Sequence, residues 1–141
     1  QILEEFKSAV AGQIPLEDGQ SHYDMGMAYL EMGMPDNAAS EFETAALSLE
    51  HQVPAFEMLA RSLLLAGRPQ EALNAVEQAA SLGIEDHERL AALFTYRGLS
   101  LEAMGHAAEA GHAIERALEY HPDFEPAREA MGRLRGATDA A

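Results

Sequence analysis

The chain has no cysteine, no long apolar run and few basic residues, since only nine of its 141 residues are lysine or arginine. Without cysteine the protein has no disulfide bond and no thiolate chemistry. No run of about 18 apolar residues occurs, so the sequence predicts no membrane insertion. The first residues, QILEEFKSAV, include no Met and do not show a basic segment followed by an apolar one, as a secretory signal would. We therefore expect a cytoplasmic domain cut from a longer protein.

The shortage of basic residues gives the chain a net charge of −15, and that charge is uneven. Residues 1–50 carry −9, residues 51–100 carry −2 and residues 101–141 carry −4. Nucleic acid and anionic membranes are poor partners for such a surface, because both require clustered Lys and Arg. The excess of acids either attracts a basic protein or simply keeps the domain in solution.

Three similar segments show that the chain is a repeat array. They are MGMPDNAASEFETAA from Met32, AGRPQEALNAVEQAA from Ala66 and MGHAAEAGHAIERAL from Met104. In each segment a Gly is followed five residues later by Ala and four residues after that by a bulky apolar residue. These triplets are Gly33, Ala38 and Phe42; Gly67, Ala72 and Val76; and Gly105, Ala110 and Ile114. The copies lie 34 and 38 residues apart, which is a period typical of stacked helical units.

Apolar residues recur at helical spacing along the whole chain, and sustained alternation typical of strands is missing. An N-terminal helix is predicted over residues 1–12. Further helices are predicted over residues 20–32, 35–49, 54–66, 69–82, 87–104, 107–120 and 125–135. The segment GIEDHERL adds four residues to the third copy, so we expect Asp86 to cap a helix about one turn longer than its counterparts.

At this point the sequence resembles the tetratricopeptide repeat family, whose signature is Trp-x2-Leu-Gly-x2-Tyr, then Ala-x3-Phe, then Pro. The resemblance spans residues 19–135. The matching positions are His22, Met25, Gly26 and Tyr29 with Ala38 and Phe42; Phe56, Leu59, Ala60 and Leu63 with Ala72 and Val76; and Phe94, Arg97, Gly98 and Leu101 with Ala110, Ile114 and Pro122. Two departures stand out: His22 replaces the aromatic residue, and Arg97 replaces the usual Leu.

The resemblance implies an all-α fold, a right-handed α-solenoid of three helix-turn-helix pairs with an extra helix at each end. The expected parts are a flanking helix and connection in 1–18, repeats in 19–52, 53–86 and 87–124, and a capping helix and tail in 125–141. The small residues Gly26, Ala60 and Gly98 should let the two helices of each unit cross closely, facing Ala38, Ala72 and Ala110.

A second apolar stripe, Tyr23, Met27, Leu30 and Met34, lies on the first helix of the first unit. In the family, first helices line a concave groove that holds a peptide or a partner helix, so the stripe is interpreted as part of a binding site. The alternative is that it packs against a neighbouring unit or the N-terminal helix. The candidate groove residues are Tyr23, Met27, Leu30, Glu31, Glu57, Arg61, Leu64, Leu65, Thr95, Leu99 and Glu102.

The resemblance implies a non-catalytic adaptor or scaffold. The groove residues favour a bound protein segment that is apolar or amphipathic, and one that is basic if the acidic surface attracts it. The family's carboxylate clamp for chaperone C-termini uses Lys, Asn and Arg, and of the matching residues here only Arg61 could serve. The alternative function is self-association as a homodimer through the groove or the N-terminal helix, whose apolar face is Ile2, Leu3, Phe6 and Val10. That helix could equally cap the array or end a preceding domain.

No pattern of residues predicts catalysis, a metal or a cofactor. A Gly-x-Ser-x-Gly elbow, a phosphate-binding glycine loop and a metal-ligand pair at helical spacing are all missing. The six histidines lie in different elements and are interpreted as solvated or capping residues. The acidic pairs, such as Glu4-Glu5 and Glu85-Asp86, are adjacent in sequence and therefore point apart.

Overall fold

The computed structural model describes residues 3–4 and 18–140, and in that part of the chain it contains seven α-helices and no strand. The helices are α2 (Gly19–Glu31), α3 (Pro35–Ala45), α4 (Gln52–Leu65), α5 (Pro69–Ala80), α6 (His87–Ala103), α7 (Ala107–Tyr120) and α8 (Glu125–Ala140), with a short 3₁₀-helix, η1 (Leu49–His51), before α4. Most of the predicted N-terminal helix, residues 1–12, lies outside the described residues. No helix of the described part is long and apolar enough to cross a bilayer.

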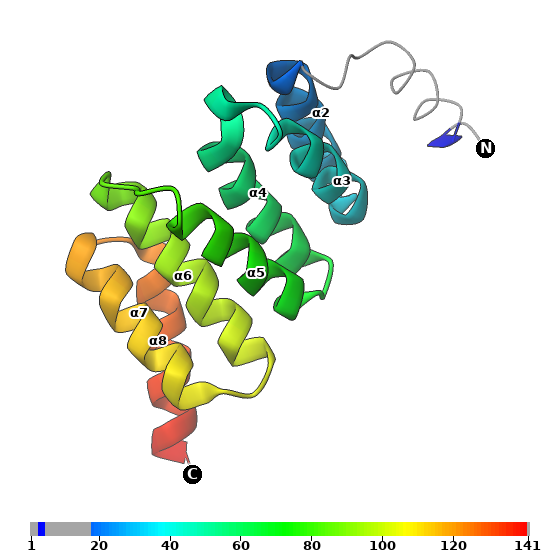
Figure 1. Cartoon of the computed structure of the whole chain (residues 1–141). Helices are drawn as coiled ribbons and strands as arrows, with labels where there is room; N and C mark the ends of the chain where they lie inside the picture. The colour runs from blue at the N-terminus through cyan, green and yellow to red at the C-terminus, as the bar shows by residue number, and fades with distance from the viewer. Residues whose placement is uncertain (1–2, 5–17, 141) are drawn as a thin grey trace.

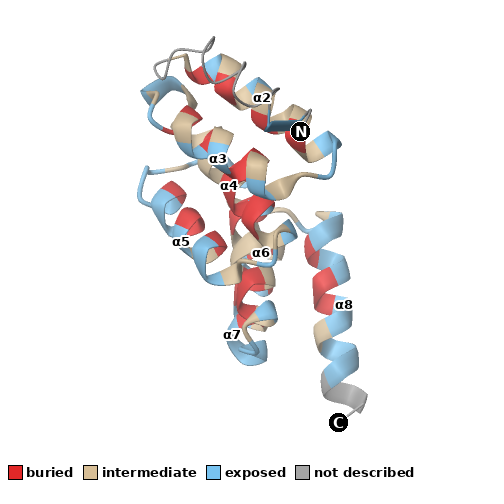
Figure 2. Cartoon of the chain, turned by 90° about the vertical axis from the view of Figure 1, so that its right-hand side faces the viewer, coloured by how far each residue is buried: buried red, intermediate tan, exposed pale blue. Residues whose placement is uncertain are grey.

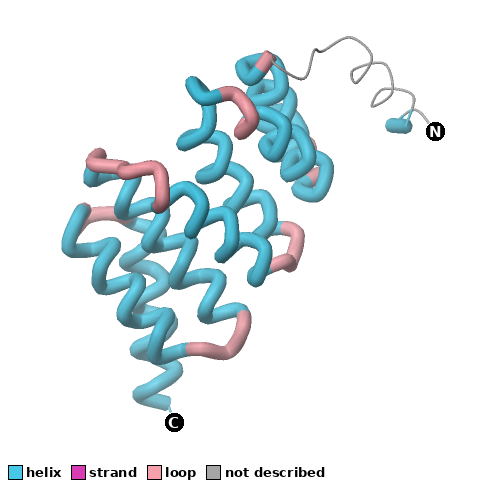
Figure 3. Tube along the Cα trace, viewed as in Figure 1, coloured by secondary structure: helices cyan, strands magenta, loops and turns pink. Residues whose placement is uncertain are grey.

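Three glycines end the first helix of each pair in the way the sequence predicts. Gly33, Gly67 and Gly105 have φ angles of 73°, 75° and 84°, a left-handed conformation that costs glycine little. Pro35 and Pro69 then begin α3 and α5, where a missing N–H breaks no helical hydrogen bond. The short connections between the paired helices are visible in Figure 3.

Helix bounds follow the sequence closely, with differences at three ends. α3 stops at Ala45 rather than near residue 49, because the chain tightens through bonds from Leu47 N–H to the Thr44 carbonyl and from Ser48 N–H to the Ala45 carbonyl. α4 begins at Gln52, so that Pro54 falls inside its first turn. α8 runs to Ala140, five residues beyond the expected end.

The third unit has the longer first helix that the extra residues predict. α6 has 17 residues, whereas α2 has 13 and α4 has 14. The carboxylate of Asp86 accepts hydrogen bonds from the backbone N–H groups of Glu88 and Arg89, which confirms it as the cap. A fourth left-handed glycine, Gly83, follows α5 and was not anticipated.

The helices pack in sequence order as an α-solenoid. α2 pairs with α3, α4 with α5 and α6 with α7, and each second helix also contacts the next first helix (Figure 1). α4 also contacts α6, and α6 contacts α8, so α8 stacks as the first helix of a further unit would. Buried positions lie on the sides of helices that face their neighbours, while the outer side of α8 is exposed (Figure 2). The all-α solenoid expected from the sequence is confirmed.

Close crossings within each pair depend on small residues, as expected, but the partners differ from those expected. A Cβ atom added to Gly26 would lie 2.7 Å from the Phe42 ring, and one added to Gly98 would lie 2.5 Å from the Ile114 side chain. The second unit has Ala60, fully buried, and the smaller Val76. Each small residue therefore makes room chiefly for the bulky residue of its own unit; at Gly98 the Ala110 carbonyl is also close, at 3.2 Å.

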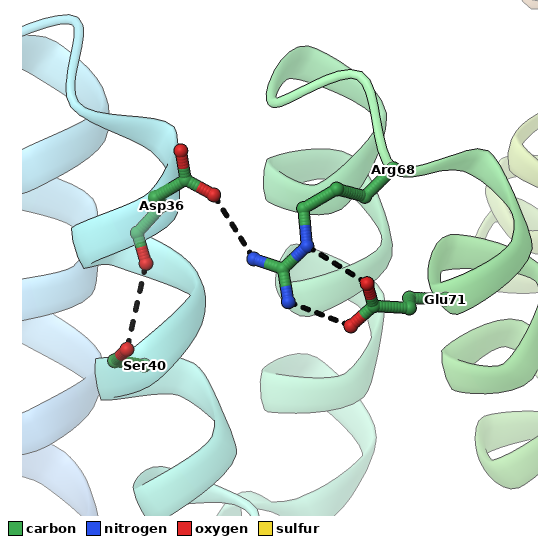
Figure 4. A network of polar contacts seen from close by, with 4 residues as sticks. All are labelled: Asp36, Ser40, Arg68 and Glu71. Atoms are coloured by element: carbon green, nitrogen blue, oxygen red, sulfur yellow. Dashed lines mark hydrogen bonds and ion pairs between the residues drawn. The ribbon is translucent and has the colours of Figure 1, made fainter.

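A polar network joins the first two units at the exposed end of their helices (Figure 4). The Arg68 guanidinium donates to Asp36 at 2.9 Å and, through two N–H groups, to Glu71 at 2.9 and 2.6 Å. The hydrogen bonds to Glu71 and Asp36 raise the pKa of Arg68, which stays charged at any relevant pH. The network fixes α3 beside α5 through solvent-exposed groups.

Candidate functional site

The candidate site lies on the face formed by the first helices α2, α4 and α6, which we call the first-helix face. On α2 the apolar stripe is only partly accessible. Tyr23, Met27, Leu30 and Met34 are half-buried and pack against the core of the first two units. The Tyr23 ring meets the Phe42 ring edge-on at 5.4 Å between centroids. Inward packing, the alternative left open by the sequence, therefore accounts for part of this stripe.

The most accessible candidate residues lie at the C-terminal ends of α2 and α4. Glu31 and Arg61 are exposed, and Leu65 is 62% exposed although it is apolar. Leu64, its neighbour, is half-buried and packs against the same core. A bound segment could contact Arg61 and Leu65 without any rearrangement.

The candidate residues of α6 differ from the expectation. Thr95 is only 1% exposed and its hydroxyl donates to the Ala91 carbonyl, so it does not lie on the surface as the sequence analysis assumed. Leu99 packs against the cluster that includes Ala127 and Met131 of α8. Glu102 accepts a hydrogen bond of 2.8 Å from Arg133 of α8. The end helix thus engages this part of the face, an arrangement that the sequence analysis missed.

Charged and aromatic groups meet where α4, α6 and the start of α8 come together. Glu57 and Arg89 form an ion pair of 3.0 Å, and their side chains are 20% and 32% exposed. Burial raises the pKa of Glu57, against the opposing effect of Arg89. Burial, with the nearby Glu57 charge, also raises the pKa of Tyr96. A cleft of about 290 Å³ here is lined by Glu57, Asp86, Glu88, Arg89, Ala92, Tyr96 and Phe124.

The opposite face, formed by α3, α5 and α7, carries the largest cleft described, and the sequence analysis did not anticipate it. We call this the second-helix face. Its cleft of about 500 Å³ lies between α3 and α5, over α4. A smaller cleft of about 250 Å³ lies between α6 and α7. The repeat signature predicts neither cleft, because its positions describe only where the two helices of a unit cross.

The histidines do not form a metal site within the described residues, where no group of three candidate ligands occurs. His22 is buried rather than solvated, and its Nδ1 lies 2.7 Å from a carboxylate oxygen of Glu41, which links α2 to α3. His51 lies 3.0 Å from the Ser48 hydroxyl, and the His87 ring stacks edge-on against Tyr120. These three histidines therefore have structural contacts.

Comparison with known proteins supports the repeat assignment. The family model of the tetratricopeptide repeat matches residues 19–47, which contain α2 and α3. No curated protein matches the chain in a sequence comparison. The resemblance to the tetratricopeptide repeat family is confirmed at residues 19–47, where the chain carries one such repeat.

Solved structures extend the fold match over most of the chain. The first tetratricopeptide domain of human RPAP3 has a TM-score of 0.76 at 17% identity, covering 89% of this chain and 96% of that one. The crystal structure of MamA has a TM-score of 0.75 at 19% identity, covering 95% and 75%. The first domain of RPAP3 (Spaghetti) bound to the HSP90 peptide SRMEEVD has a TM-score of 0.75 at 17% identity, covering 89% and 97%. At these identities the likeness concerns the fold.

Proposed function

We propose that the protein is a non-catalytic interaction module that binds a segment of another protein on its first-helix face. The observation that carries this proposal is the exposed pair Arg61 and Leu65 beside half-buried apolar residues on α2 and α4. A contiguous exposed apolar patch marks a surface that a partner covers, and Leu65 would form such a patch together with the partly open stripe. RPAP3 domains of the same fold hold peptides, which supports this role.

The bound segment is apolar or amphipathic and carries basic residues. Leu65 and the accessible parts of Met27 and Leu30 suit apolar anchors at helical spacing. Around the neighbouring cleft the three carboxylates of Glu57, Asp86 and Glu88 outnumber the single cation Arg89. Methionine adapts its shape to different partners, which suits such a surface.

Peptides ending in EEVD are not expected to bind. The RPAP3 structures hold SRMEEVD and SGPTIEEVD, which are acidic at their C-termini. Of the residues that match the family's clamp, Tyr23, Met27 and Glu57 offer no cation, and Arg61 stands alone. Titrating a labelled SRMEEVD peptide by fluorescence anisotropy tests this point. Saturable binding that Arg61→Glu abolishes would contradict the proposed partner chemistry.

A capture experiment tests the proposal itself. The wild-type chain is compared with an Arg61→Glu/Leu65→Glu variant for proteins retained from a native lysate, as identified by mass spectrometry. Both residues are exposed, so the variant should keep the helical content and melting temperature of the wild type. We expect partners that the wild type retains and the variant loses.

The matched control is Arg128→Glu/Leu49→Glu, which makes the same two changes at exposed positions that are not among the candidate groove residues. Leu49 is 85% exposed and lies in η1, and Arg128 lies on the outer side of α8. The control should retain the same partners as the wild type. Equal loss in both variants would show a general effect of added negative charge and would reject the first-helix site.

Self-association is the second candidate function, since Leu65 and the α2 stripe could meet a second copy in a symmetric dimer. Analytical ultracentrifugation separates the two. A concentration-dependent dimer that Arg61→Glu/Leu65→Glu dissociates would favour self-association over binding of a different protein.

A further inference from the structure

The cleft on the second-helix face has an apolar floor and no basic residue in its lining. α4 supplies the floor with Phe56, Leu59 and Leu63, and the turn after α3 supplies Leu47, which is 71% exposed, at one rim. The complete lining is Glu43, Ala46, Leu47, Gln52, Phe56, Leu59, Leu63, Glu71, Asn74, Ala75 and Gln78.

This cleft is separate from the site of the proposed function. At 100° per residue around α4, the mean direction of Glu57, Arg61 and Leu64 lies about 130° from that of Phe56, Leu59 and Leu63. The two surfaces are therefore on different sides of α4. A ligand in one does not contact the other.

The next unit contains a matched cleft, which makes an internal comparison possible. Phe56, Leu59 and Gln78 correspond to Phe94, Arg97 and Arg116, which lie 38 positions further along the chain. Four further pairs complete the correspondence. Residues Leu63, Glu71, Asn74 and Ala75 of the first cleft correspond to Leu101, Glu109, His112 and Ala113 of the second, all of which line it.

Two of the protein's own cations line the second cleft. The Arg116 guanidinium lies 5.1 Å from the centre of the Phe94 ring, in a cation–π geometry. Arg97 lines the same cleft at the position where the first cleft has Leu59. The cleft volume falls from about 500 Å³ to about 250 Å³. At equivalent positions the first cleft has no cation to cover Phe56.

We propose that the first cleft, between α3 and α5, is a second docking site that takes a protein segment with a bulky apolar side chain flanked by Lys or Arg. The apolar side chain lies over Phe56, and the flanking cation takes the place that Arg116 takes over Phe94. The segment belongs to a different protein from the one bound on the first-helix face.

Charge selects this occupant. The two charged residues of the lining are Glu43 and Glu71. Arg68 neutralises Glu71, but Glu43 is exposed and has no ion-pair partner among the described residues. A Lys or Arg arriving beside Glu43 gains a partner, while an acidic segment meets repulsion from it and from the net charge of the chain. The complementarity thus favours a basic segment over an acidic one.

Selection of random dodecapeptides displayed on phage, against the full chain, tests the proposal. We expect the selected peptides to combine a bulky apolar residue with Lys or Arg. The diagnostic variant is Gln78→Arg, which places a guanidinium where Arg116 lies in the next unit and should cover Phe56. Gln78 is exposed, so the fold should be unaffected, as circular dichroism will show. A synthetic selected peptide should bind this variant about tenfold more weakly or worse, equivalent to about 1.4 kcal/mol of binding free energy.

The control is Gln70→Arg, which makes the same substitution at another exposed position of α5, outside the cleft. It should bind the peptide as the wild type does. The proposal is overturned if both variants weaken binding equally, if no apolar and basic peptide is selected, or if binding is lost only with Arg61→Glu/Leu65→Glu. This last result would place every peptide on the first-helix face and leave the proposed function intact. A dimer that Gln78→Arg dissociates would overturn it in favour of a second copy as occupant.

Discussion

The second and third units have the same pair of helices but different side chains at their helix crossings and in their clefts. The helices of the second unit cross at Ala60 and Val76, and those of the third cross at Gly98 and Ile114. The second unit thus has one more carbon on its first helix, and the third has one more carbon on its second helix. The second unit has Leu59 and Gln78 in the lining of its cleft, whereas the third has Arg97 and Arg116 at the equivalent positions. The crossing tolerates exchanges that conserve volume, and the space between units does not need to be filled for the fold to form.

The largest effect is expected from breaking the volume balance of the third crossing. Gly98→Ala should lower the free energy of unfolding by about 1–2 kcal/mol, because overpacking typically costs about 1–3 kcal/mol and the better helix propensity of Ala offsets part of that cost. The added Cβ lies 2.5 Å from Ile114. Urea denaturation measures the change.

The double variant Gly98→Ala/Ile114→Val rebuilds the crossing of the second unit and sharpens the comparison. Ile114→Val alone should cost about 0.5–1.5 kcal/mol. The double variant should be more stable than the sum of the single effects implies, since the smaller Val leaves room for the new methyl group. Strict additivity would mean that the two residues do not share the space.

A smaller effect is expected from opening the second cleft. Arg116→Gln gives it the residue of the first cleft and should cost about 0.5–1 kcal/mol, the usual contribution of an exposed cation–π contact. Gln78→Arg in the first cleft should bring a comparable gain, by covering Phe56. Denaturation of the two variants side by side checks both signs. A loss in both would show that the clefts are not equivalent.

The exposed network between the first two units should matter less. Arg68 contacts Asp36 and Glu71, whereas the equivalent positions of the next unit hold His106, Gln70 and Glu109. Arg68→Gln should cost less than about 0.5 kcal/mol at moderate salt, because exposed ion pairs contribute little. Measured melting temperatures with and without added salt should differ little between wild type and variant. The prediction is wrong if Arg68→Gln lowers the melting temperature by several degrees and added salt lowers that of the wild type by the same amount.

The last prediction concerns pH and depends on the buried carboxyl of Glu57. Its pKa is raised in the folded state, chiefly by burial, so the folded protein binds this proton more tightly than the unfolded chain does. Stability from this group therefore rises as the pH falls from neutral through the folded pKa towards the unfolded value near 4.5. Relative to Glu57→Gln, the wild type should gain stability between pH 7 and pH 4.5, as measured by denaturation at both values. If the wild type instead loses stability relative to Glu57→Gln, the effect of Arg89 on the pKa of Glu57 outweighs that of burial.

Much of the fold could be read from the sequence, because the signals are local. Gly33, Gly67 and Gly105 mark helix ends, and the four extra residues before α6 lengthen that helix. Small residues opposite bulky ones reveal the crossings.

The site was less predictable, because exposure depends on what other units cover. Thr95 has the periodicity of a surface residue but is buried, and Leu99 packs against α8. His22 was expected to be exposed but is buried, in contact with Glu41. Arg97 departs from the repeat signature and is a sequence signal that distinguishes the two clefts. Its role could be assigned only from the structure, in which Arg116 lines the same cleft.

The stacked order of the helices also bears on how the chain folds. The ion pairs Asp36–Arg68, Glu57–Arg89 and Glu102–Arg133 join residues only 31 or 32 positions apart. Most contacts of the domain are shorter still in sequence, since they join adjacent helices, and folding rates of helical proteins with such low contact order lie in the microsecond to millisecond range. Among the described helices, α8 contacts chiefly α7 and α6, so we expect it to open before the middle of the array. Amide hydrogen exchange should then be slower in α4, α5 and α6 than in α8.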